Sequence, residues 1–333
     1  MKNRREFLKG AATGAVLLSS GGKLAMAARA AESASAAKSK VVIARDPQLH
    51  PSGSTQPDEK RVQALLDRAM ASYTGKEKPV DAWKSIVRPT DKVIGLKVNG
   101  LGSKGIATHY ALIMAVAERL QQAGVKPGNI VVWEQNQRFL EACGVTVSTD
   151  PNKIRCIPAD SFGYEDQESS FGSAKIRVSK LLTRECDMII NMPILKDHMM
   201  AGVTFAMKNM YGTVDRPMNL HANNCNPAVA DLNCIPVYRN KIRFVIGDAM
   251  SSVYEGGPRF SPERLWYPNA LIIGEDRVAL DTIAWEWLDK KRVEAGVGTL
   301  KAAGREPLYI AAAAAAERNL GTNDPSKIHR VEI

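Results

Sequence analysis

Cysteine, histidine and aromatic residues are scarce in this chain. Its 333 residues include 5 cysteines and 5 histidines, and only 6% of them are aromatic. No two cysteines are spaced C-x-x-C, so the sequence does not encode a ferredoxin-type iron–sulfur cluster with that spacing. With 24% charged and 45% hydrophobic residues, the composition excludes a disordered polymer, a collagen and a small disulfide-stapled toxin.

Long hydrophobic runs and basic stretches interleaved with aromatic residues are also absent. The apolar stretch at residues 10–20 is roughly half of the ~20 residues that a bilayer-spanning helix needs, so we expect no stable membrane span. The formal net charge is +10, but residues 1–27 carry +4 of it and the remaining +6 is scattered. We therefore expect no nucleic-acid partner.

The first 27 residues follow the order of a secretory signal. A basic run, Asn3 to Lys9, precedes the weakly apolar stretch, and the small residues Ala25-Met26-Ala27 follow it. Arg4 and Arg5 followed by Phe-Leu-Lys resemble the twin-arginine (Tat) export signal, which is an address read by a receptor. The sequence predicts export by the Tat translocation machinery to the periplasm or the cell exterior. Residues 28–57 are then a flexible linker and an irregular N-terminal segment.

An exported protein can keep disulfide bonds, and this bears on the cysteines. Cys225 and Cys234 lie close together in the sequence and could form a disulfide. We expect Cys143, Cys156 and Cys186 to be buried free thiols.

In the body of the chain, apolar runs of strand length alternate with helical segments. Several runs are continuously apolar, which is typical of strands covered on both faces. This alternation predicts an α/β fold over residues 58–333: a doubly wound, mostly parallel sheet with helices on both faces. The pattern also allows a first strand from residue 40 and a smaller second lobe. The expected strands are 41–44, 93–98, 130–133, 188–191, 244–246 and 270–273, and the expected helices are 59–73, 108–123, 278–288 and 308–320.

Polar side chains follow most of the expected strands. In open parallel sheets, binding sites gather beyond the carboxyl ends of the strands, so these side chains are expected to converge at one edge. They are Asn99, Glu134, Asn191, Lys196, Asp197, His198, Asp248, Glu275 and Asp276.

A glycine loop, Gly100-Leu101-Gly102-Ser103-Lys104-Gly105, matches G-x-G-x-x-G between a strand and a helix. One interpretation is a nucleotide-binding oxidoreductase, but Glu134 comes 29 residues after Gly105, where about 20 are expected. A second is a loop whose N–H groups bind an anion at a helix N-terminus, with Lys104 assisting. A third is a plain turn.

A dense polar cluster lies at residues 192–198. Its Asp197 and His198, together with His221 and Asp248, would supply imidazole and carboxylate ligands suited to zinc, iron or manganese. Lys196 is a cation for an anionic substrate or, if desolvated, a base or a covalent nucleophile. The alternative is a charged surface cluster at a turn.

These motifs resemble the family catalogued as domain of unknown function 362. The matching segments are Lys97-Val98-Asn99, Asn191 to His198, Lys208 to Gly212, His221 with Ala230-Asp231-Leu232, Gly247-Asp248-Ala249, Glu255 to Pro258, Asp276 to Asp281 and Asn319-Leu320-Gly321. The resemblance implies the α/β fold. It also implies that some relatives carry iron–sulfur segments, for which this chain lacks the cysteine pattern.

Together these features predict an exported enzyme that binds a metal or a small anionic ligand at the strand ends, with redox chemistry as an option. Its catalytic residues would be Lys196, His198 and Asp248, and its metal ligands Asp197, His198, His221 and Asp248. Its cofactor-binding residues would be Asn99, Gly100, Gly102, Lys104, Asn191, Lys208 and Asn209. The alternative is a non-catalytic periplasmic binding or accessory protein for a metal or cofactor.

Overall fold

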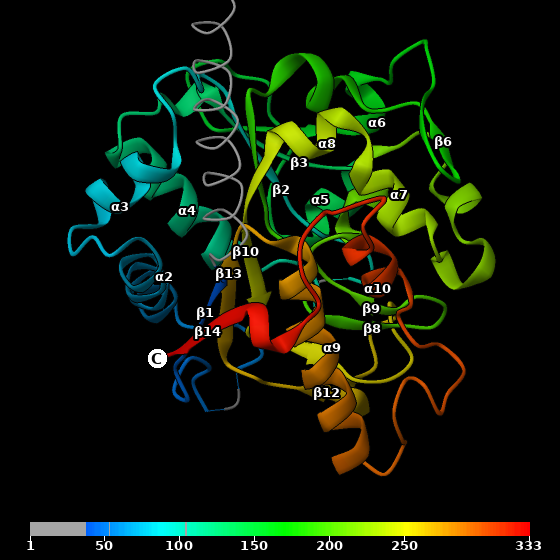
Figure 1. Cartoon of the computed structure of the whole chain (residues 1–333). Coiled ribbons are helices and arrows are strands. Elements are labelled where there is room, and N and C mark those ends of the chain that lie inside the picture. The colour runs from blue at the N-terminus through cyan, green and yellow to red at the C-terminus, as the bar shows by residue number, and fades with distance from the viewer. Residues whose placement is uncertain (1–37, 53, 104) are drawn as a thin grey trace, which may run out of the picture. The chain divides into compact units, whose positions relative to one another are not determined.

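Eight strands form one large, mostly parallel sheet (Figure 1). The computed structural model describes residues 38–52, 54–103 and 105–333, so the expected signal, residues 28–37 of the expected linker, and Lys104 lie outside it. In order across the sheet, the strands are β14 (Ile328–Glu332), β1 (Ser39–Arg45), β13 (Ala270–Gly274), β10 (Ile242–Ala249), β7 (Met188–Asn191), β2 (Ile94–Lys97), β3 (Ile130–Glu134) and β4 (Arg155–Pro158).

The strands from β10 to β4 all end at the same edge of the sheet. The pairs β10–β7, β7–β2, β2–β3 and β3–β4 are parallel, and so is β1–β14. β13 runs antiparallel to its neighbours β1 and β10. The parallel block therefore gathers the residues that follow five strands, as the sequence predicted.

The remaining strands form three separate two-stranded antiparallel hairpins. They are β5 (Ser169–Phe171) with β6 (Ala174–Ile176), β8 (Lys196–His198) with β9 (Gly202–Thr204), and β11 (Ser252–Val253) with β12 (Leu265–Trp266). The β8–β9 hairpin comes just after β7, so it brings its polar residues to the strand-end edge of the sheet.

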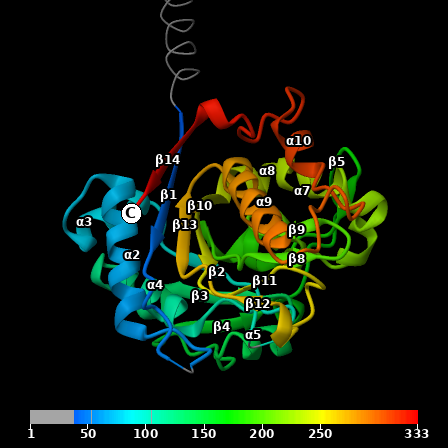
Figure 2. The ribbon, with the colours of Figure 1, turned by 90° about the horizontal axis from the view of Figure 1, so that it is seen from below.

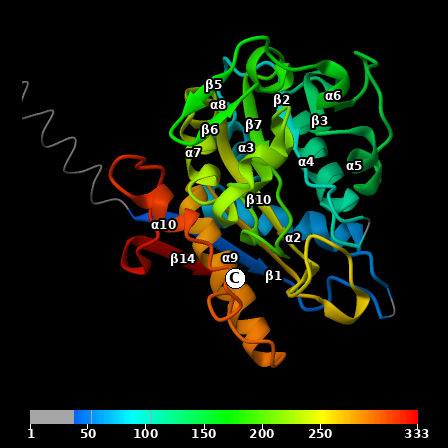
Figure 3. The same cartoon turned by 90° about the vertical axis from the view of Figure 1, so that its right-hand side faces the viewer.

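Helices cover both faces of the sheet. Figure 2 shows α2, α3 and α4 on one side of the strands and α9 with α7 and α10 on the other, and Figure 3 shows α7 beside α10. The helices are α2 (Glu59–Thr74), α3 (Pro79–Ile86), α4 (Tyr110–Gln122), α5 (Gln137–Ala142), α6 (Ala159–Phe162), α7 (Ala228–Cys234), α8 (Pro236–Lys241), α9 (Arg277–Glu294) and α10 (Tyr309–Ala314). Short turns of 3-10 helix, η3 (Lys208–Thr213), η4 (Pro217–Leu220) and η5 (Ala222–Cys225), connect β9 to α7.

The apolar residues of the strands pack into separate cores on the two faces of the sheet. In β13, Leu271 and Ile273 pack with α2 and α4, whereas Ala270 and Ile272 pack with α9 on the opposite face. All four side chains are fully buried. Successive residues of a strand point to opposite faces, so a strand covered on both sides has to be apolar at every position. This confirms the doubly wound α/β fold.

The prediction of a helix over residues 308–320 is wrong at the C-terminal end of the helix. α10 stops at Ala314, although alanine continues to Ala316 and favours a helix. The following segment turns so that Arg318 donates to Asp231 at 2.7 Å, and Arg239 donates to the Asn319 carbonyl oxygen. Tertiary hydrogen bonds therefore override the helix propensity here.

Two strands of the large sheet, β4 and β14, were missed by the sequence pattern, as were the short strands of the three hairpins. β4 contains a proline and has only four residues, and β14 is a half-exposed edge strand that carries His329 and Arg330. Neither has the continuous apolar run by which the other six strands were recognised.

Residues Ser39–Ile333 form one compact unit, without the second lobe that the sequence allowed. Among the helices described, none combines the length and the hydrophobicity that crossing a membrane requires.

Candidate functional site

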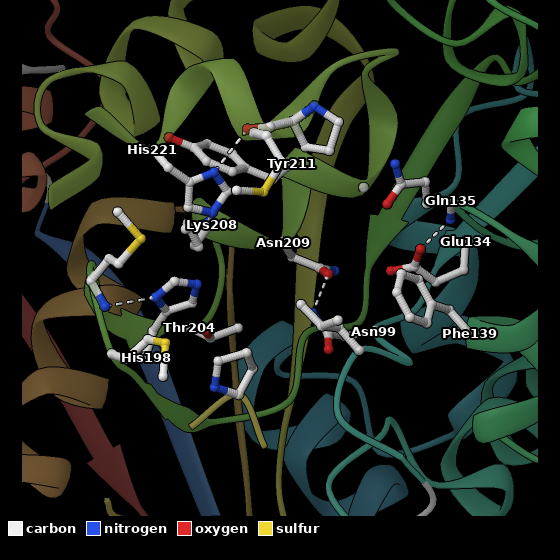
Figure 4. A pocket seen from close by; sticks show the side chains of 17 residues that line it. Asn99, Glu134, Gln135, Phe139, His198, Thr204, Lys208, Asn209, Tyr211 and His221 are labelled. Carbon is white, nitrogen blue, oxygen red and sulfur yellow. Dashed lines mark hydrogen bonds between the residues drawn. The ribbon is translucent and has the colours of Figure 1, made fainter. Parts of the chain in front are cut away.

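A cavity of about 430 Å³ opens where β2 and β3 end (Figure 4). Its polar walls include six of the residues predicted from the sequence, namely Asn99, Glu134, His198, Lys208, Asn209 and His221. The remaining lining residues are Leu101, Gln135, Phe139, Met199, Met200, Thr204, Tyr211, Gly212, Pro217, Met218 and Pro258. A cavity therefore lies at the strand ends, where the sequence predicts the site.

One wall of the cavity rests on a buried ion pair. The amino nitrogen of Lys97 lies 3.0 Å from Oε1 of Glu134 and donates to the Val98 carbonyl oxygen at 2.6 Å. Lys97 and Glu134 end the adjacent strands β2 and β3, and both side chains are buried. The two charges compensate each other, so this wall carries no net charge.

A chain of three amides forms the floor. Asn99 Nδ2 donates to Asn209 Oδ1 at 2.9 Å, and Asn209 Nδ2 donates to Asn191 Oδ1 at 2.7 Å. Asn191 Nδ2 then donates to the Ala206 carbonyl oxygen at 2.7 Å. Each amide fixes the orientation of the next, so the floor is rigid and its groups are already satisfied.

Lys196 lies behind the floor and does not line the cavity. Its amino group donates to Asn99 Oδ1 at 2.7 Å, to the Ile106 carbonyl oxygen at 3.1 Å and to the Leu101 carbonyl oxygen. Burial lowers the pKa of Lys196 to about 7. All three donors of its ammonium form have partners, so its evident role is to hold Asn99 and the glycine loop in place.

The glycine loop packs against the protein itself. A Cβ on Gly100 would lie 1.8 Å from the Phe139 carbonyl oxygen, and Gly102 has a φ of +110° with the Pro258 carbonyl oxygen 2.1 Å from its Cβ position. These contacts account for the glycine spacing without a nucleotide. Lys104, the loop residue predicted to assist an anion, is outside the described residues.

Lys208 and His221 lie side by side in the wall opposite the Lys97–Glu134 pair. The amino nitrogen of Lys208 lies 3.3 Å from His221 Nε2 and 3.5 Å from the centre of the Tyr211 ring. His221 Nδ1 lies 2.9 Å from the Pro217 carbonyl oxygen, so Nδ1 carries the proton and Nε2 accepts. Burial lowers the pKa of Lys208 to about 7, and burial together with the Lys208 charge lowers the pKa of His221.

His198 presents an N–H group to the cavity. Its Nδ1 accepts from the backbone N–H groups of Met200 at 3.1 Å and Ala201 at 3.2 Å, so its Nε2 carries the proton. Burial, reinforced by the Lys208 charge, holds the pKa of His198 well below its usual range. The hydroxyl of Thr204, on the paired strand β9, is buried without a hydrogen-bond partner.

Asp197 points away from the cavity. It accepts from Arg305 and from the Gly257 N–H at 2.9 Å, and Arg292 lies 3.8 Å from it. Side chains alternate along β8, so Asp197 faces the opposite side from His198. This corrects the prediction that the two residues bind the same metal.

Asp248 is also remote from the cavity wall. Its Oδ2 accepts from His109, from the backbone N–H at 2.9 Å and from Nδ1 at 2.8 Å, and its Oδ1 accepts from the Met250 N–H at 3.0 Å. His109 precedes α4, so Asp248 anchors the start of that helix. The predicted catalytic role of Asp248 has no support in this position, because it is fully buried among its own partners.

The four predicted metal ligands do not assemble. His198 and His221 come together, with ring centres 5.8 Å apart, but Asp197 and Asp248 do not join them. Within residues 38–333, apart from positions 53 and 104, no three His, Cys, Asp or Glu side chains are placed to hold a metal ion.

The disulfide between Cys225 and Cys234 is not formed either. All five cysteines are buried free thiols. Cys225 lies in η5 near Tyr211, whereas Cys234 ends α7 and accepts from Arg239 at 3.5 Å. The two thiols thus have separate surroundings.

Comparison with known proteins identifies the family. Residues 94–286, more than half of the chain, match the family described as Domain of unknown function (DUF362). The chain belongs to this family. The motif resemblance seen in the sequence is thereby confirmed.

This DUF362 chain is similar to a thylakoid-associated protein of Synechocystis sp., with 28% identity over 155 residues, which cover 45% of this chain and 47% of that protein. It thus spans about half the length of that relative. It is also similar to the crystal structure of a Thermotoga maritima protein, with 13% identity and a TM-score of 0.46, covering 71% of this chain and 60% of that one.

Lys97, Thr204 and Tyr211 were not in the predicted set of site residues. Lys97 is the lysine of the family motif Lys-x-Asn, so that motif contained a signal for it, whereas Tyr211 occupies an unspecified position of the motif Lys-Asn-x-x-Gly. Thr204 has no such signal, because only the register of the β8–β9 hairpin places it beside the cavity.

Proposed function

We propose that this chain binds a small organic acid, with the carboxylate at Lys208 and an apolar body in the rest of the cavity. The observation that carries the proposal is the unpaired amino group of Lys208. The side chain is 5% exposed, and among the residues described no carboxylate lies within ion-pairing distance of it. A buried cation without a counter-charge is costly, so an anionic ligand would be stabilised there.

The other free polar groups nearby also suit an anion. His198 offers its Nε2–H group, and Thr204 offers an unpartnered hydroxyl. Both are hydrogen-bond donors that a carboxylate oxygen can use. The pairing Lys97–Glu134 on the far wall is complete, so it does not compete for the ligand.

The apolar body of the ligand has ample contact surface. Phe139, Met199, Met200, Met218 and Pro258 line the cavity, and the flexible methionine side chains can adapt to ligands of different shape. A volume of about 430 Å³ lies in the range of small-molecule sites. An organic acid with one ring fits this description better than a bare inorganic ion.

Calorimetry with 3-phenylpropionate tests the proposal. We expect binding to the wild type, and a loss of roughly thirtyfold or more in the Lys208→Met variant, because the buried charge partner is gone. Lys153→Met is the matched control, since that side chain is 76% exposed, and it should bind like the wild type. Equal affinity for 3-phenylpropionate and for the neutral 3-phenylpropanol would overturn the proposal.

The proposal also includes the location of the protein: the twin arginines Arg4 and Arg5 support its export. The site would then act on molecules of the periplasm or cell exterior.

A further inference from the structure

Lys208, His221 and Pro217 form a hydrogen-bonded series that ends in the cavity. The amino nitrogen lies 3.3 Å from His221 Nε2, and His221 Nδ1 is held 2.9 Å from the Pro217 carbonyl oxygen. A nucleophile, a base within hydrogen-bond reach and a group that orients the base are the parts required for covalent catalysis. We propose that Lys208 forms an imine with the keto group of a 2-oxo acid bound in this cavity. This inference rests on the proposed organic-acid site.

Of the buried lysines in the described part of the chain, Lys208 is the one placed to add to a carbonyl group in the cavity. The Lys97 ammonium is held by Glu134, and the donors of Lys196 are all bound to oxygen atoms away from the cavity. Lys208 lines the cavity and has only a neutral imidazole and an aromatic face as partners. The lowered pKa of Lys208, about 7, leaves a large share of the amine unprotonated at neutral pH in the free protein.

His221 is placed to take up the proton that the attack releases. Its Nδ1–H is fixed on Pro217, so its Nε2 lone pair points toward the lysine nitrogen. In Figure 4 the His221 ring and the His198 ring both border the same part of the cavity. His221 therefore acts through Lys208 as a positioning and proton-accepting residue.

The β8–β9 hairpin supplies the groups that hold the acid. His198 pairs with Gly202 and Lys196 pairs with Thr204, so His198 and Thr204 share one face of the hairpin. Their N–H and O–H groups would hold the carboxylate of a 2-oxo acid next to Lys208, so that its neighbouring carbonyl carbon meets the lysine nitrogen. We therefore expect a 2-oxo acid to react in preference to a simple aldehyde, which has no carboxylate.

The step balances without an oxidant. The lone pair of the Lys208 nitrogen adds to the carbonyl carbon, and the nitrogen gives one proton to His221 Nε2, which passes it to the carbonyl oxygen to give a neutral carbinolamine. The nitrogen then gives its second proton to His221 Nε2, which delivers it to the departing hydroxyl group. The C–O bond breaks, water leaves and the C=N bond forms. The products are one imine and one water from one amine and one carbonyl group.

Reductive trapping tests the inference. The full chain is incubated with phenylpyruvate and sodium cyanoborohydride, which adds hydride to an imine and makes the link permanent, and the modified peptide is identified by mass spectrometry. We expect one saturable adduct on Lys208 that excess 3-phenylpropionate blocks. Lys208→Arg should lose the adduct, and Lys153→Arg should keep it.

Two further measurements separate the possible outcomes. In His221→Gln we expect trapping to slow at least fivefold and its pH profile to change, which a purely structural role would not produce. Phenylpyruvate that binds as tightly as 3-phenylpropionate but leaves no adduct on Lys208 would overturn the imine and leave the organic-acid site standing. If neither compound binds, the proposed function itself fails. If Lys208→Arg does not fold, the wild-type protein alone tests the inference. Loss of the Lys208 adduct in the presence of excess 3-phenylpropionate supports it, and an adduct that 3-phenylpropionate does not reduce overturns it.

Discussion

The amino nitrogen of Lys208 lies 3.3 Å from Nε2 of His221 and is enclosed at the wall of a cavity. Its two neighbours, His221 and the ring of Tyr211, carry no negative charge that would compensate the ammonium form of Lys208. The pair therefore differs from Lys97 and Glu134, 3.0 Å apart, which neutralise each other on the opposite wall. The contrast between these two buried lysines is the basis of the functional account.

The Lys208→Met variant should be more stable than the wild type at low pH. The pKa of Lys208 falls from its ordinary value of 10.5 to about 7 on folding, so the folded state carries the cost of the buried charge below pH 7 and is freed of it as the pH rises toward 10. We expect the gain in unfolding free energy at pH 6 to exceed that at pH 10 by about 2–4 kcal/mol. Urea denaturation at both pH values measures this, and equal gains would contradict it.

Glu134→Gln should destabilise the fold strongly. The substitution leaves the Lys97 ammonium buried without its counter-charge, which costs about 3–5 kcal/mol. Glu317→Gln is the control, because Glu317 makes an exposed pair with Arg318 that contributes about 0–1 kcal/mol. Chemical denaturation compares the two variants. Similar unfolding free energies would show that the buried pair carries no special weight.

Asp248→Ala should affect stability and spare ligand binding. It removes the acceptor of two bonds from His109 and one from Met250, at a cost of about 2–4 kcal/mol in unfolding free energy. The affinity for 3-phenylpropionate should change less than about threefold, since Asp248 does not line the cavity. His198→Ala is the counterpart: it should weaken binding roughly fivefold by removing an N–H donor. Binding lost in Asp248→Ala but kept in His198→Ala would reverse these roles.

Replacing both Arg4 and Arg5 by lysine should retain the protein in the cytoplasm. The Tat receptor reads the arginine pair, and lysine keeps the charge without the guanidinium group. Cell fractionation of a Tat-competent bacterial host measures the distribution, with Lys2→Arg as the control. Unchanged export of the double variant would refute the predicted route.

Local patterns predicted the strands and the edge of the sheet where the cavity lies. Continuous apolar runs such as Ile130–Trp133 identify strands that are covered on both faces, because burial on two sides leaves no polar position. The polar residues that follow or end these strands, Asn99 and Asn191 included, then come to the same edge because parallel strands end together. Edge strand β14 and the end of α10 were not predictable in this way, since their conformations depend on tertiary partners.

Which of the polar residues line the cavity and which form internal contacts was less predictable from the sequence. Asp197 and His198 are neighbours in the sequence, yet the alternation of β8 sends the carboxylate to Arg305 and the imidazole to the cavity. Lys196 and Lys208 are both buried, but only the hydrogen-bond partners show that one is structural and the other is free. Such differences arise from the packing of distant segments, which residue spacing does not record.

A direct titration of Lys208 tests the central claim that this amine is the anion-binding group. Carbon-13 NMR of labelled lysine, with the Cε resonance assigned by its loss in Lys208→Met, gives its pKa in the free protein and with saturating 3-phenylpropionate. We predict a midpoint near 7 in the free protein, rising by about one unit or more with ligand, because the bound carboxylate stabilises the ammonium form. A midpoint above 10 in the free protein, or one that 3-phenylpropionate leaves unmoved, would contradict the account.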